Sequence, residues 1–131
     1  MKSKVLLDTN VVIRFFVQDN QEMFQKSQSV MNDIASGKCD AVLLDLIIAE
    51  IIYVMQKVYR VEKVKIVDAV KLIISYDHMH VDNQLIILKA LNLYMDKNID
   101  FADAILCAKN NLEGYQVMSF DKDIKKCTKK V

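Results

Sequence analysis

The chain has 131 residues, 53% of them hydrophobic, and a formal net charge of +1. We expect one domain, residues 1–131, large enough to bury roughly two-thirds of its unfolded surface, and the composition excludes a disordered protein. With no apolar run near the roughly 20 residues of a membrane span and no signal-peptide pattern, we expect a cytoplasmic protein with no membrane partner.

Strand and helix patterns alternate along the whole chain, which has no proline and two glycines. In chain order we predict a strand over 4–8, helices over 11–17 and 20–36, a strand over 41–44, helices over 45–59 and 62–75, a strand over 79–81, helices over 82–96 and 100–112, a strand over 115–119, and a short helix from Asp121. This alternation predicts an α/β fold, a three-layer α/β/α sandwich with a central parallel sheet of four or five strands.

Asp8 ends the first apolar run and is the only charged residue between Lys4 and Arg14. An ionised carboxylate in apolar surroundings is costly unless it has partners. Ligands bind at the carboxyl ends of parallel strands, and Thr9 and Asn10 follow Asp8 directly. We therefore predict a metal or phosphate site at Asp8.

Glu50 is the sole charge from Leu46 through Met55. An exposed polar stripe is the alternative, but nearly every other face of this predicted helix is apolar. We therefore expect an inward-facing functional glutamate, which needs a cation or hydrogen-bond donors.

Asp100 and Asp103 stand three residues apart, on one face of the first turn of a predicted helix. Helix capping competes strongly as an explanation for Asp100. Asp103 differs because Ala102 and Ala104 beside it leave room for a metal or substrate to approach.

Asp121 follows the last predicted strand, after Ser119. Capping of the final helix is again the alternative. Asp8, Glu50, Asp103 and Asp121 would all lie at one rim of a parallel sheet, where carboxylates repel one another unless a divalent cation holds them ionised. Oxygen ligands without a Cys or His set favour Mg²⁺ or Mn²⁺, and hence metal-dependent phosphoryl chemistry.

Four segments carry a resemblance to a known family: LLDTN, DLIIAEIIYVM, DFADAILCA and VMSFDKDI. In this order they resemble the PIN-domain ribonucleases, and most closely the VapC-type toxins of bacterial type II toxin–antitoxin pairs. The resemblance runs from Val5 to about Ile124. No single segment is specific for this family, but the four segments in the right order and register are a strong signal.

The resemblance implies a Mg²⁺- or Mn²⁺-dependent endoribonuclease. Asp8 and Asp103 would be the main metal ligands, and Glu50 and Asp121 would complete the catalytic acids. Auxiliary positions would be those of Asn10, Asp100 and Ser119, where Ser119 stands in place of the threonine of many members. The implied partners are RNA and a small VapB-like antitoxin, and apolar helix faces favour a homodimer.

Other interpretations fit less well. A haloacid-dehalogenase-like phosphatase needs a second Asp two residues after the first, and Asn10 stands there. A receiver-like signalling domain lacks its acidic pair at the first strand, although Asp45 imitates its phospho-acceptor. A non-enzymatic interaction module with an acid pocket stays open as the alternative function.

Remaining chemistry-bearing residues carry lower expectations. Cys39, Cys107 and Cys127 have no paired spacing, so we expect thiols rather than a disulfide or a zinc site. His78 and His80 are expected to be structural or exposed. The lysines near the C-terminus form a solvated end or, as an alternative, steer a polyanion.

Overall fold

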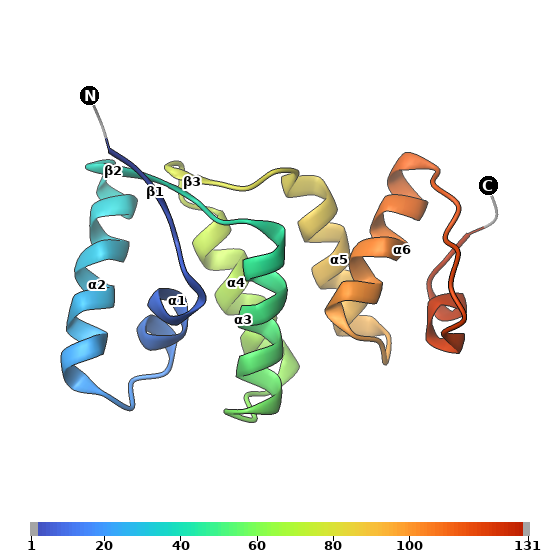
Figure 1. Cartoon of the computed structure of the whole chain (residues 1–131), viewed down its shortest axis with the longest axis horizontal. Coiled ribbons are helices and arrows are strands. Elements are labelled where there is room, and N and C mark those ends of the chain that lie inside the picture. Colours follow the sequence, from blue (N-terminus) through green and yellow to red (C-terminus); the bar gives the residue numbers. More distant parts are fainter. Residues whose placement is uncertain (1–2, 130–131) are drawn as a thin grey trace. The chain divides into compact units, whose positions relative to one another are not determined.

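The computed structural model describes residues 3–129, which divide into two compact units, one ending at Asp82 and the other beginning at Asn83 (Figure 1). The first unit contains a parallel sheet and four helices. Its elements are β1 (Ser3–Leu6), α1 (Thr9–Phe16), α2 (Gln21–Ser36), β2 (Cys39–Val42), α3 (Asp45–Lys57), α4 (Lys63–Ile74) and β3 (Met79–His80). The order of strands is β1-β2-β3, and both strand pairs are parallel.

Ala41 lies at the centre of this sheet, opposite Val5 on one side and Met79 on the other, and it is fully buried. The core of the unit continues into the isoleucines of α3 and α4, and Ile48, Ile51 and Ile73 have no exposed surface. The apolar faces of α3 and α4 are therefore buried, as their periodicity predicts, whereas Leu6 of β1 is 70% exposed.

The predicted limits of α2 are confirmed by both caps. The side chain of Asn20 accepts a hydrogen bond from the N–H of Met23, and Gly37 ends the helix in the left-handed conformation at φ 84°. A Cβ at residue 37 would lie 2.7 Å from His78 Nε2. Glycine is thus required there for its backbone and for space.

The second unit contains α5 (Gln84–Asp96), α6 (Phe101–Glu113) and the short 3₁₀ helix η1 (Lys122–Lys126). Asn83, rather than Asp82, caps α5, with its side chain accepting from the N–H of Ile86. The two helices pack through an edge-to-face contact of Tyr94 and Phe101, with ring centroids 6.0 Å apart. Burial and the charge of Asp100 raise the pKa of Tyr94 to about 12.

One expectation needs correction in the second unit, since residues 115–119 are not a strand. The described residues contain three strands, and a sheet of four or five strands stays a prediction. An alternating pattern gives a segment the tendency to extend, but a strand also needs a neighbour to pair with. The α/β class and the parallel sheet are confirmed, while the sandwich layering stays a prediction.

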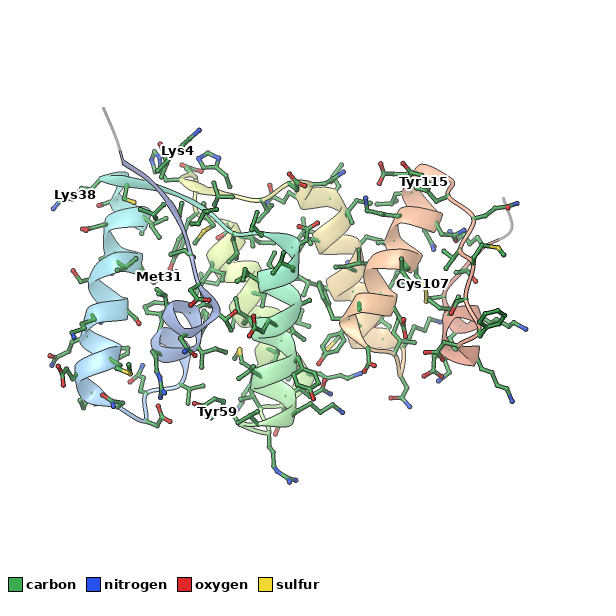
Figure 2. The ribbon with its side chains drawn as sticks, viewed as in Figure 1. Lys4, Met31, Lys38, Tyr59, Cys107 and Tyr115 are labelled. Atoms are coloured by element: carbon green, nitrogen blue, oxygen red, sulfur yellow. A yellow bond between two sulfur atoms is a disulfide. The ribbon has the colours of Figure 1, made fainter. Side chains whose placement is uncertain are left out.

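The expectation of free thiols is wrong for two cysteines. Cys107 on α6 and Cys127 after η1 form a disulfide, with their Cα atoms 5.6 Å apart (Figure 2). Cys39 is a free thiol. Sequence spacing missed the pair because a return of the chain along α6 brings residues 20 positions apart together. Within residues 3–129, no helix has the length and hydropathy needed to cross a membrane.

Candidate acidic site

Asp8 stands between β1 and α1, at the end of the strand where the sequence predicts a ligand site. It is the N-cap of α1, and its Oδ1 accepts a hydrogen bond of 2.8 Å from the N–H of Thr9. Its side chain is exposed, as is that of Asn10 in the first turn of the helix. The capping bond engages Oδ1 and leaves the carboxylate accessible at the surface of the unit.

Glu50 on α3 is tied to this end of α1 by a hydrogen bond. The hydroxyl of Thr9 donates to Glu50 Oε2 at 2.8 Å, across 41 residues of sequence. Thr9 is 5% exposed, whereas Glu50 is exposed, so the inward-facing orientation expected from its apolar helix is wrong. The donor that such a glutamate was predicted to need is present, and it is the residue next to Asp8.

Arg14 follows one helical turn after Asn10 and pairs with Asp19 at 2.8 Å. Asn10, Val11 and Arg14 line a crevice of about 180 Å³ between α1 and α2. Its walls are aliphatic, including the stems of the charged side chains, so it adds no ligand for a cation.

In the second unit, Asp103 interacts with three other carboxylates. The pKa of Asp103 is raised, first by loss of hydration and then by the charges of Asp121, Asp100 and Asp123. Asp103 lies in the first turn of α6 and is partly buried. Each neighbouring charge disfavours its ionised form.

Asp100 and Asp121 occupy cap positions, as the competing interpretation expected. Asp100 is the N-cap of α6, yet its side chain makes no capping hydrogen bond. Asp121 caps η1 by accepting from the N–H of Asp123 at 2.9 Å, and Ser119 Oγ accepts from the N–H of Asp121 at 3.0 Å. Capping therefore accounts for Asp121 locally and does not account for Asp100.

Asp123 was missed at the sequence level, although it stands in the VMSFDKDI segment two residues after Asp121. Its influence on Asp103 depends on η1 lying against α6, which a one-dimensional pattern does not show. Asp123 also pairs with Lys126 at 2.8 Å, and Lys126 donates to the carbonyl of Asn98 at 3.1 Å. One of the C-terminal lysines therefore has a structural role.

The predicted site residues form two groups, one in each unit. The first unit holds Asp8, Asn10 and Glu50, with Thr9 linking two of them. The second unit holds Asp100, Asp103, Ser119 and Asp121. Across residues 3–129, no three carboxylate, imidazole or thiol side chains already form a cage for a metal ion.

The donor chemistry of both groups fits a hard divalent cation. Every candidate ligand is a carboxylate, amide or hydroxyl oxygen, the set that Mg²⁺ and Mn²⁺ prefer. A cation among the four acids of the second unit would relieve the repulsion that raises the pKa of Asp103.

The two histidines lie elsewhere. His78 Nδ1 and His80 Nε2 are 3.0 Å and 3.4 Å from Asp40 Oδ1, beside the parallel pairing of β2 and β3. This confirms the structural or exposed interpretation of both side chains.

Comparison with protein families gives one match. The model of the PIN domain family matches residues 5–130, and the chain therefore belongs to that family. The match runs through both units and includes every predicted site residue. Comparison with curated proteins finds no match.

Proposed function

We propose that this PIN domain is a metal-dependent endoribonuclease that hydrolyses RNA phosphodiester bonds. PIN domains are typically nucleases that act on RNA or other nucleic acid and use divalent metal ions. The observation that carries the proposal is the cluster around Asp103, where four carboxylates interact in spite of their mutual repulsion. Such a cluster is costly for the fold and suits a cation site.

The roles follow from the positions of the side chains. Asp8 and Asp103 would hold Mg²⁺ or Mn²⁺, with Asp121 and Asp100 completing the negative surface. When bound, the cation lowers the pKa of a water and stabilises charge on the phosphodiester. Glu50 would orient the attacking water, because the Thr9 hydroxyl fixes one of its oxygens and leaves the other accessible.

The proposal includes a single domain over residues 1–131. The family match supports it, since one continuous model covers residues 5–130. Asp8 and Glu50 belong to the first unit, and Asp103 and Asp121 belong to the second.

We extend the proposal to the biological role of a VapC-type toxin with a VapB-like antitoxin and a homodimeric state. Large apolar side chains are exposed on α3 and α4: Leu46 and Tyr53 on the first, Val64 and Leu72 on the second. Leu46 and Tyr53 are seven residues apart and share one face of α3. Exposed apolar groups of this kind support an interface with a second copy or an antitoxin. A cytoplasmic location is also part of this proposal.

RNA cleavage by the purified chain tests the proposal. The wild type should cleave single-stranded RNA with Mg²⁺ or Mn²⁺, leave 5′-phosphate ends, and stop when EDTA is added. Asp8→Asn should lose at least about a hundredfold in rate, and Asp19→Asn, which changes an acid of the Arg14 ion pair, should not. Cleavage that survives EDTA, or equal rates in both variants, would overturn it.

A further inference from the structure

Asn110, a buried residue of α6, ties down both ends of the segment that carries Asp121 and Asp123. Its side chain donates to the carbonyl of Tyr115 at 2.7 Å and to that of Lys129 at 3.0 Å. Its Oδ1 accepts from the N–H of Lys129 at 2.6 Å. Asn110 is 4% exposed and thus closes a loop over residues 115–129 from a buried position on α6.

A second set of ties lies beside it on α6. Asn111 Nδ2 donates to the carbonyls of Cys107 at 2.6 Å and Cys127 at 2.8 Å. The Cys107–Cys127 disulfide joins the same two backbones covalently. We call Cys107, Asn110, Asn111 and Cys127 the C-terminal clasp.

The clasp and Asp103 occupy one face of α6. Counted from Asp103, the clasp residues of this helix follow after four, seven and eight positions, at Cys107, Asn110 and Asn111. This spacing places all four side chains on one side of the helix. The chain after α6 returns along the helix (Figure 1). The side chain of Ile124 in η1 is buried and anchors that short helix. The same helix face thus presents Asp103 and holds the segment that bears Asp121 and Asp123.

Electrostatic repulsion works against this arrangement. The Cys107–Cys127 disulfide and the contact of Cys107 Sγ with the Ile124 carbonyl at 3.8 Å hold η1 against α6, which places the segment of Asp121 and Asp123 beside the helix that bears Asp103. Without a restraint, a loop of this length would move its acids apart to lower that repulsion. The buried hydrogen bonds of Asn110 are costly to break, because two carbonyls and one N–H would lose their partner.

We propose that Asn110 is a positioning residue of the acidic site, which, with the rest of the C-terminal clasp, holds Asp121 and Asp123 beside Asp103 in readiness for a divalent cation. The inference rests on the proposed function for the identity of the ligand. It adds that the affinity for that ligand depends on residues that do not touch it.

Two variants, each with one asparagine changed to alanine, test the clasp. Asn110→Ala removes the three side-chain hydrogen bonds of Asn110. Asn83→Ala is the control, because it removes an asparagine side-chain hydrogen bond in the same unit, at the α5 cap. Mn²⁺ affinity is measured by calorimetry without RNA, and the protection of amides 119–124 by hydrogen exchange without metal. We expect Asn110→Ala to bind Mn²⁺ about tenfold more weakly and to lose protection at 119–124, and Asn83→Ala to match the wild type in both.

Unchanged protection at 119–124 in Asn110→Ala would overturn the inference, and so would unchanged affinity for Mn²⁺ when the wild type binds it. If Asn110→Ala does not fold, Cys127→Ser opens the second set of ties and is judged by the same two measurements. A wild type that binds no Mn²⁺ would count against the proposed function, and loss of protection in Asn110→Ala alone would still support the clasp.

Discussion

Thr9 offers the sharpest perturbation of the proposed catalytic acids, because it links Glu50 to the end of α1 without being an acid itself. In Thr9→Val, a methyl group replaces the hydroxyl that donates to Glu50 Oε2 at 2.8 Å. The shape is kept and the site is buried, so the change removes one hydrogen bond and little packing.

The loss of stability follows from the exposure of the acceptor. A hydrogen bond to a charged group contributes about 1.5–3 kcal/mol when no water replaces the donor. Glu50 is exposed and regains water, so we expect the loss to fall below that range, at about 1 kcal/mol in the free energy of unfolding. Urea denaturation measures this value.

The effect on catalysis should exceed the effect on folding. A glutamate without its donor samples more rotamers, and we expect the rate of RNA cleavage to fall about tenfold in Thr9→Val. Thr9→Ser keeps the hydroxyl and should stay close to the wild type. Equal cleavage rates in the valine and serine variants would refute the idea that Thr9 orients Glu50.

Three further predictions follow from single residues. Asp103→Asn should raise the free energy of unfolding at pH 7 in metal-free buffer, because the fold disfavours the ionised form of Asp103. This gain should vanish as the pH falls below 3.8, where the wild-type carboxyl is protonated in both the folded and the unfolded state. Urea denaturation at a series of pH values measures the gain. Tyr94 should ionise only near pH 12, so an ultraviolet titration of the five tyrosines should show one tyrosine that ionises later than the others. A titration without such a late tyrosine would contradict the burial of Tyr94. Gly37→Ala should cost about 1–2 kcal/mol, since residue 37 has φ 84° and no room for a Cβ beside His78; a melting temperature equal to the wild type would contradict this.

Local features of the fold were predictable where one physical signal dominates. Asn20 and Gly37 mark the limits of α2 because a side-chain cap and a left-handed residue have few substitutes. The apolar runs predicted the places of the first two strands, but not their burial, since Leu6 of β1 is 70% exposed. By contrast, residues 115–119 were predicted as a strand and form none in the described part of the chain, because a strand needs a pairing neighbour that the sequence pattern does not specify.

The candidate site was predictable as a set of residues and less so in its contacts. Asp8, Asp103 and Asp121 stood out as isolated acids, but the donor to Glu50 is Thr9, which the sequence presents only as a polar neighbour of Asp8. The role of Asn110 and the Cys107–Cys127 disulfide were not predicted either. Each depends on a segment returning to a helix from 19 or 20 residues away.

The central claim is that the proposed acidic residues bind a divalent cation. Calorimetric titration of Mn²⁺ into the wild type, Asp8→Asn and Asp103→Asn, without RNA, tests it most directly. We expect binding to the wild type and at least about a tenfold loss of affinity in each variant. Wild-type affinity in both variants would contradict the claim.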